Sequence, residues 1–148
     1  MDVSYINPFI ESVYELFTTM MGAKATRGKA VLAQTGDKQT NVTALIGWSG
    51  PARGTVALTL PEHTAMAVAG RLLGMEMDSL NEDVMDAISE VVNIIAGGAK
   101  AKFSASQGIG TIDLSLPTVI TGPQYEVEHP SRSTQIDVPF ESELGPFS

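Results

Sequence analysis

Cysteine is absent from this chain of 148 residues, and long apolar runs are absent as well. Without cysteine there are no disulfides, no thiolate metal sites and no thiol nucleophiles, which fits a reducing compartment. The apolar stretch from Tyr5 to Met21 is interrupted by Asn7, Pro8 and Glu11, so it predicts neither a signal peptide nor a membrane span. We therefore expect a cytoplasmic protein without a membrane partner.

Basic residues are scarce, since 9 Lys and Arg stand against 17 Asp and Glu, for a net charge of −8. Such a surface repels phosphate backbones and anionic lipid, so nucleic acid is not expected as a partner. The two histidines, His63 and His129, do not have the spacing of zinc ligands, and we expect no metal site. The length fits one domain over 1–148, and a hydrophobic content of 43% suffices for its core.

Three segments have apolar residues at three- and four-residue spacing, which predicts three helices. In the first, Asn7 is a suitable N-cap, Pro8 fits the first helical position and Gly22 can end the helix. For the longest helix, Ser79 and Glu82 have the spacing of a capping box. The predicted helices cover 8–21, 61–73 and 80–103, with Asn7 and Ser79 as the caps before the first and the third.

Short runs rich in Val, Ile, Leu and Thr predict strands on both sides of the second and third helices. The short turns between the first three strands favour an antiparallel meander, because parallel crossovers need longer connections. The fold class is therefore α+β, with helices packed on an antiparallel sheet and two strand blocks flanking a central helix pair. The predicted strands cover 30–34, 42–48, 55–60, 111–116, 118–121, 125–128 and 134–138.

A polar line runs along the longest predicted helix, where Asp86, Glu90, Asn93 and Gly97 are spaced by four, three and four residues. Glycine inside a helix costs roughly 0.5–1 kcal/mol relative to alanine. The pair Gly97-Gly98 is therefore best explained if some other group must approach the backbone closely at this point. The alternative is that the line is simply the exposed side of an amphipathic helix. The apolar line expected to be buried comprises Val84, Ile88, Val91, Ile95, Ala99 and Phe103.

The same line carries a resemblance to a known family. The run of Glu90, two residues, Asn93 and, four residues later, Gly97 resembles the signature helix of the CheX/CheC/FliY family of chemotaxis phosphatases. With one such motif and no extra domain, the chain is most similar to the CheX branch. Further segments that resemble the family are 46–50, 54–58, 73–75 and 114–122.

The resemblance implies a CheC-like fold and a phosphatase that hydrolyses the phosphoryl-aspartate of a CheY-type response regulator. It implies that Asn93 orients the attacking water and that Glu90 pairs with a lysine of the receiver domain. Asp86, Ser89 and Gly97 would contact that partner. The Mg²⁺ would belong to the receiver, so no cofactor of its own is expected, and the protein would be a homodimer.

A second hypothesis remains open, in which the chain is a non-catalytic docking module. It would bind a receiver domain or another signalling protein through the same helix. The presence of both Glu90 and Asn93 favours the enzyme. Burial of these two side chains, or their cover by loops of the protein itself, would favour the docking module.

Overall fold

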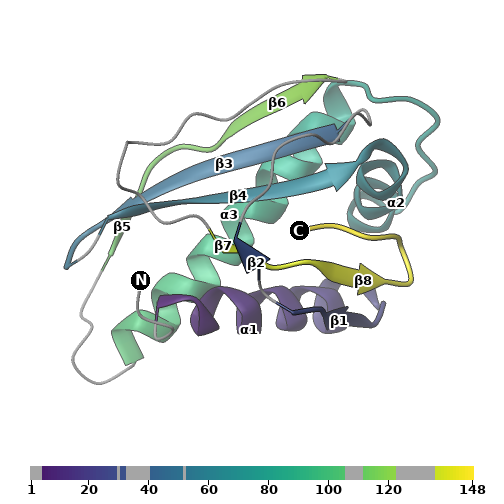
Figure 1. Cartoon of the computed structure of the whole chain (residues 1–148). Helices are drawn as coiled ribbons and strands as arrows, with labels where there is room; N and C mark the ends of the chain where they lie inside the picture. Colours follow the sequence, from purple (N-terminus) through teal and green to yellow (C-terminus); the bar gives the residue numbers. More distant parts are fainter. Residues whose placement is uncertain (1–4, 30, 33–40, 52, 106–111, 123–135) are drawn as a thin grey trace.

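The computed structural model describes residues 5–29, 31–32, 41–51, 53–105, 112–122 and 136–148, and Figure 1 shows their arrangement. In chain order the elements are α1 (Asn7–Leu16), a π-helical segment η2 (Phe17–Met21), β1 (Ala25–Arg27), β2 (Val31–Leu32), β3 (Asn41–Ser49), β4 (Gly54–Pro61), α2 (Glu62–Leu73), α3 (Glu82–Ala105), β5 (Asp113–Leu114), β6 (Thr118–Gly122), β7 (Ile136–Asp137) and β8 (Phe140–Ser142).

Strand β3 is the centre of a four-stranded antiparallel sheet. β4 pairs with one edge of β3, whereas β5 and β6 pair in succession with the other edge. The predicted three-stranded meander is therefore wrong, because strands from the second block occupy the edge that β2 would need. β2 pairs instead with β7, and β1 pairs with β8, both in antiparallel orientation.

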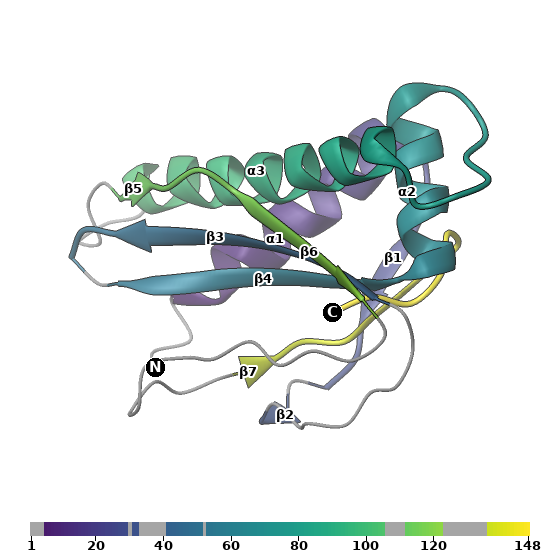
Figure 2. The same cartoon turned by 90° about the horizontal axis from the view of Figure 1, so that it is seen from above.

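Helix α3 crosses one face of the four-stranded sheet, while α1 packs against α3 and α2 packs at one end of the sheet (Figures 1 and 2). The small pair of β2 and β7 lies on the opposite side of the sheet from α3 (Figure 2). The predicted α+β class, with helices on an antiparallel sheet, is confirmed. The core between α3 and the sheet contains Val42, Ala44, Ile46, Val84, Ile88, Val91, Val92 and Ile95.

The first helix begins one residue earlier than predicted. Ile6 is the N-cap, because its carbonyl oxygen accepts hydrogen bonds from the N–H groups of Phe9 (3.0 Å) and Ile10 (3.2 Å). Asn7 is thus the first helical residue, and the prediction that it caps the helix is wrong. The predicted end at Gly22 is confirmed, since this residue has φ 59° and follows the π-helical segment.

The second helix agrees with its prediction, but the cap of the third does not. α2 follows Pro61 and ends at Gly74, which has φ 71°. At the start of α3 the side-chain oxygen of Asn81 accepts a hydrogen bond from the Val84 N–H at 3.0 Å. Asn81 is therefore the N-cap, and the capping box predicted at Ser79 is wrong.

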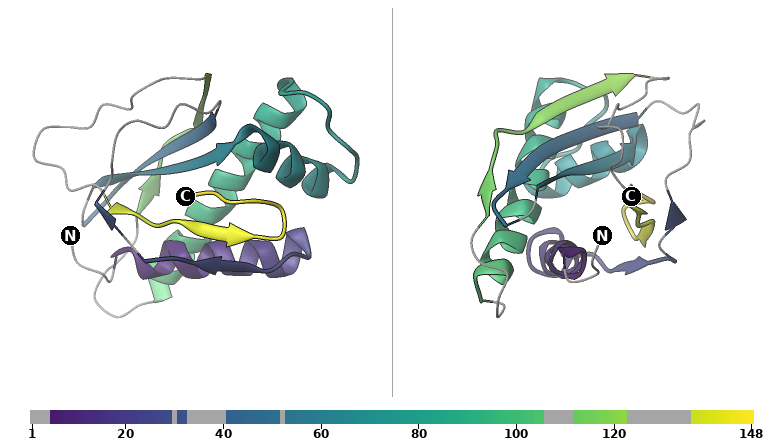
Figure 3. Two further views of the ribbon diagram at one scale, coloured as in Figure 1. Left: turned by 45° about the vertical axis from the view of Figure 1, so that its right-hand side comes forward. Right: turned by 60° about the vertical axis from the view of Figure 1, so that its left-hand side comes forward.

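The strands after α3 are shorter than the sequence predicts, and one additional strand is present. The expected strand 118–121 is confirmed as β6. Of the described residues in the predictions 111–116 and 134–138, those at 113–114 and 136–137 form strands. The strand predicted at 125–128 lies outside the described residues. The additional strand, β8, lies beside the C-terminal segment, which also pairs with β4 through two hydrogen bonds between Thr59 and Ser148 (Figure 3).

An aromatic cluster fixes the C-terminal part of α3 against the end of β3. Phe103 of α3 lies 6.0 Å from Trp48 between ring centroids, and Tyr5 and Phe9 pack on the same two rings. Trp48 in turn covers Gly54, where a Cβ would lie 2.6 Å from the indole ring. Glycine is required at the start of β4 because the indole occupies the place of a side chain.

Candidate functional site

Helix α3 has one buried side and one exposed side, as the sequence predicts. The predicted apolar line is fully buried, because it packs on the sheet and on α1. The polar line lies on the opposite side, where Asp86, Glu90, Asn93 and Gly97 are all exposed. Ser89, the remaining predicted site residue, is half-buried at the margin of this line.

Glu90 and Asn93 lie one turn apart on the exposed side. With a rise of 1.5 Å per residue, their Cα atoms are separated by about 4.5 Å along the helix axis. Among the described residues, neither side chain takes part in a hydrogen bond or an ion pair. Their polar groups are therefore available for a molecule that approaches α3 from solvent.

The negative charge of the site is concentrated in the first half of α3. Glu82 and Asp83 occupy the first turn, where carboxylates are stabilised by the partial positive charge of a helix N-terminus. Asp86 and Glu90 continue this acidic surface towards Asn93. A cationic group of a partner would consequently be attracted to the line beside Asn93.

The two glycines of α3 have different surroundings. A Cβ placed on Gly97 would have no neighbour within 4 Å, so nothing in the described chain requires glycine at this position. A Cβ placed on Gly98 would collide with the hydroxyl of Ser12 in α1. Gly98 thus allows the two helices to cross closely, whereas Gly97 leaves the backbone of the polar line uncovered.

Two side chains tie α3 to α1 behind this surface. The hydroxyl of Ser12 donates a buried hydrogen bond of 2.8 Å to the carbonyl oxygen of Ile95. Lys102 Nζ lies 2.6 Å from Glu15 Oε1 and 3.8 Å from Glu11 Oε2. The hydrogen bond to Glu15, with the charges of both carboxylates, raises the pKa of Lys102 above its usual value.

Sequence reasoning missed Ser12 and Lys102 as residues that hold the site helix in place. One signal for Ser12 was present, since a small polar residue stands next to Val13 on the otherwise apolar side of α1. No local sequence pattern predicts that Lys102 contacts α1, because its hydrogen-bond partner Glu15 lies 87 positions earlier in the chain.

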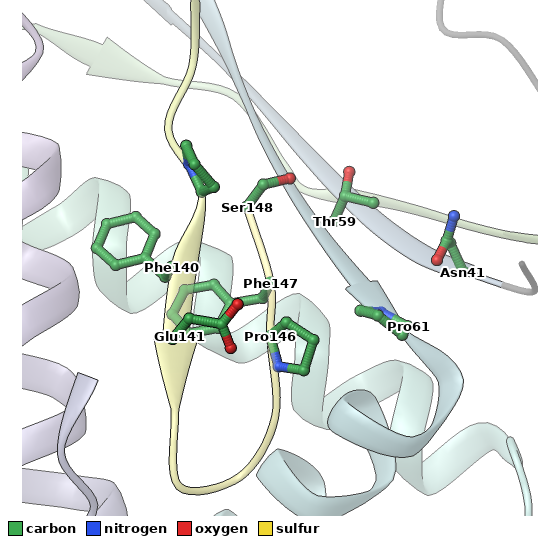
Figure 4. Close-up of a pocket in the computed structure, with 9 residues that line it drawn as sticks. Asn41, Thr59, Pro61, Phe140, Glu141, Pro146, Phe147 and Ser148 are labelled. Carbon is green, nitrogen blue, oxygen red and sulfur yellow. The ribbon is translucent and has the colours of Figure 1, made fainter. Parts of the chain in front are cut away.

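A shallow pocket with a volume of about 260 Å³ lies at the opposite side of the sheet, between β4 and the C-terminal segment (Figure 4). Asn41, Thr59, Glu141 and Ser148 supply its polar groups, and prolines and phenylalanines supply the rest. None of the predicted site residues lines this pocket, and the polar line lies instead on the exposed side of α3. Such a surface suits a protein partner better than a small molecule.

The described residues contain no cluster of three or more His, Asp or Glu side chains that could hold a metal ion. None of the helices in the described part of the chain is long and apolar enough to cross a membrane.

Comparison with protein families identifies the fold and its class of activity. The family described as chemotaxis phosphatase CheX matches residues 42–141, which include β3, β4, α2, α3 and the strands that follow. The chain belongs to the CheX family of chemotaxis phosphatases. The expected resemblance to CheX is thereby confirmed, and the protein is a phosphatase by family.

Individual CheX relatives agree with this assignment. The CheY-P phosphatase CheX of Thermotoga maritima is 28% identical over 130 residues, which span 86% of this chain and 82% of the relative. A CheC-like superfamily protein from Shewanella sp. PV-4 has a TM-score of 0.86 at 31% identity, covering 99% of this chain and 95% of that chain. The chemotaxis protein CheX from Vibrio vulnificus has a TM-score of 0.84 at 28% identity, covering 97% and 94%.

The CheX fold also recurs in a more distant complex. The structure of a CheX–CheY–BeF₃–Mg²⁺ complex from Borrelia burgdorferi has a TM-score of 0.77 at 24% identity. It covers 99% of this chain and 94% of that chain. At this level of identity the likeness concerns the fold.

Proposed function

We propose that this CheX-family protein hydrolyses the phosphoryl-aspartate of a CheY-type response regulator, with Glu90 and Asn93 as its catalytic residues. The observation that carries the proposal is the exposure of both side chains, one turn apart, on an open face of α3. The name of the Thermotoga relative, a CheY-P phosphatase, supports the choice of substrate. An exposed helix face also fits a reaction whose phosphoryl group is carried on another protein.

Hydrolysis of a phosphoryl-aspartate requires few catalytic groups from the phosphatase. Water attacks phosphorus, the bond between phosphorus and the aspartate oxygen breaks, and the products are inorganic phosphate and a free carboxylate. Because an acyl phosphate already has a good leaving group, the main requirement is a water placed in line with that bond. The Asn93 amide can hold this water by donating one hydrogen bond and accepting another. A carboxylate at position 93 would repel the phosphoryl group.

Glu90 serves to place the receiver. Its carboxylate forms a charge-assisted pair with a lysine near the phosphoryl group, which sets the orientation of docking more than the affinity. Asp86 and Ser89 extend this contact along α3. Gly97, with open space over its backbone, allows a loop of the receiver to lie close to the helix.

The Mg²⁺ needed for the reaction belongs to the receiver in this proposal, and the phosphatase contributes no metal ligand. The complex from Borrelia burgdorferi, which contains CheX, CheY, BeF₃ and Mg²⁺, is compatible with that division.

We also propose that the protein acts in the cytoplasm as a homodimer. Within the described residues β6 pairs only with β3, and its second edge is where a strand of another copy would pair.

The test is loss of phosphate from a panel of the organism's receiver domains, each phosphorylated with a small-molecule donor. Native protein is compared with Asn93→Ala and Glu90→Ala, and Glu76→Ala is the matched control because it removes an exposed carboxylate away from α3. We expect Asn93→Ala to lower the rate by about a hundredfold or more, as for other misplaced reactants. The control should keep the native rate.

A receiver that binds native protein but keeps its phosphate would contradict the enzyme and support the docking module. Equal losses in Asn93→Ala and Glu76→Ala would contradict the assignment of Asn93 to the attacking water.

A further inference from the structure

The segment Ser115-Leu116-Pro117 interrupts the edge of the main sheet beside α3. Leu114 of β5 pairs with Trp48, and Thr118 of β6 pairs with Leu45. Three residues of this edge therefore stand opposite only two residues of β3, Ile46 and Gly47. An extra residue of this kind is a β-bulge, and bulges commonly redirect a side chain next to a functional site.

The bulge is held by specific bonds. The N–H of Ser115 donates to the carbonyl oxygen of Gly47 at 2.9 Å, and the N–H of Gly47 donates to the Ser115 hydroxyl, also at 2.9 Å. A side chain thus takes the place of a backbone carbonyl in the ladder. Pro117 has no N–H to donate. Leu116, between these two residues, is released from the sheet and is 88% exposed.

This segment lies beside the C-terminal half of α3, into which the polar line extends at Gly97. Ile112, just before β5, packs against Ala99 and Phe103, and both β5 and β6 contact α3. In Figures 2 and 3 the chain between β5 and β6 runs along the C-terminal half of the helix. The segment that carries Leu116 therefore lies beside the C-terminal half of α3, which begins after Asn93 and contains Gly97.

Leu116 differs in position from the other exposed large apolar residues of the described chain. Those residues, Met20, Leu73 and Met75, belong to the end of η2 and the end of α2. The polar line on α3 is narrow and contains no large apolar side chain. Protein interfaces obtain most of their binding energy from a few desolvated anchors at the centre, with polar groups around them.

We propose that Leu116 is an apolar anchor for the receiver domain that docks on α3, an inference that rests on the proposed function. The receiver then contacts two surfaces at once. The polar line of α3 contacts its phosphoryl site, and Leu116 of the bulge makes a second, apolar contact. The partner must accordingly present an apolar patch next to the cationic group that Glu90 contacts. Since Leu116 does not touch the reacting atoms, its contribution is to binding.

The experiment measures kcat and KM for a phosphorylated receiver with native protein, Leu116→Ser, Leu116→Met and the control Met75→Ser. Leu116→Ser should raise KM about tenfold and leave kcat near the native value, because an apolar contact made equally in ground and transition states is lost. Leu116→Met keeps an apolar side chain and should restore KM. Met75→Ser removes an exposed apolar residue elsewhere and should behave as native protein.

Sedimentation of each variant at the assay concentration completes the test. An unchanged KM in Leu116→Ser overturns the proposal, and so does a rise in KM that accompanies loss of a dimer, which would assign Leu116 to self-association. If native protein dephosphorylates no receiver, the proposed function fails separately, and titration with phosphorylated receiver decides the inference. Weaker binding by Leu116→Ser then supports the anchor, whereas equal binding, or no binding by native protein, overturns it.

Discussion

Ser12 of α1 lies directly against Gly98 of α3, and the two residues set how closely the helix of the site crosses its neighbour. The Ser12 hydroxyl occupies the space where a side chain at position 98 would begin. It also donates to the carbonyl oxygen of Ile95, within one turn of both Asn93 and Gly97. The backbone that carries the polar line is therefore supported from behind by one buried hydroxyl.

We expect Gly98→Ala to destabilise the protein. The added methyl group would meet Ser12 Oγ and lie 3.2 Å from Ser12 Cβ, so the hydroxyl must give up its bond to Ile95 or α1 and α3 must separate. Overpacking of a tight contact costs about 1–3 kcal/mol. Urea unfolding, followed by the single tryptophan, measures the loss. The double variant Ser12→Ala/Gly98→Ala should recover part of it, because the hydroxyl is gone. An unchanged midpoint for Gly98→Ala would show that the helices do not cross this closely.

Gly97→Ala should have the opposite effect on stability. A Cβ at this position meets nothing within 4 Å, and alanine is favoured over glycine in a helix by roughly 0.5–1 kcal/mol. Unfolding free energy should rise by about that amount, while kcat/KM for a phosphorylated receiver falls because the methyl group stands where the partner approaches. A variant that is more stable and fully active would contradict the role of Gly97 in close approach.

The contrast between these glycines shows where sequence reasoning succeeds on this chain. The exposed line on α3 follows from helical periodicity alone, so Glu90, Asn93 and Gly97 could be placed on one face before the structure was known. The reason for Gly98 could not be found, because its neighbour Ser12 is brought close only by the packing of two helices. A pattern within one segment holds no information about that contact.

The strand pairing in the main sheet could likewise be predicted only in part from the sequence. The hairpin of β3 and β4 was predictable, since its strands are joined by a short turn with Gly50 and Pro51. The partner on the other edge of β3 was not, because β5 and β6 arrive from beyond two helices and displace the strand nearest in sequence. Pairing between strands that are distant in sequence depends on how all the helices and strands pack around the core.

The N-cap of α3 is Asn81 and not the predicted Ser79, and substitution of each residue tests this assignment. Asn81→Ala removes the acceptor of the Val84 N–H and should lower the free energy of unfolding by about 1 kcal/mol, the usual cost of losing an N-cap. Ser79→Ala is the matched control, and it should leave stability nearly unchanged because Ser79 precedes the helix. Circular dichroism with thermal unfolding measures both. A larger loss for Ser79→Ala would restore the capping box that the sequence suggests.

The contact between Lys102 and Glu15 leads to a prediction about high pH. Because the folded-state pKa of Lys102 is raised above 10.5, its value in the unfolded chain, the charged amine contributes stability that is fully present below pH 10.5. This contribution is lost as pH rises through the higher folded-state pKa. Native protein and Lys102→Met should therefore differ most in unfolding midpoint near neutral pH and converge above pH 10.5.

Other groups also titrate at high pH, so the informative quantity is the difference between the two proteins at each pH. The difference should be small, as expected for a pair at the surface, and should shrink further in concentrated salt. A difference that stays constant from pH 8 through the alkaline range would mean that Lys102 contributes through packing of its aliphatic chain on α1. Its charge would then not be what joins the end of the site helix to α1.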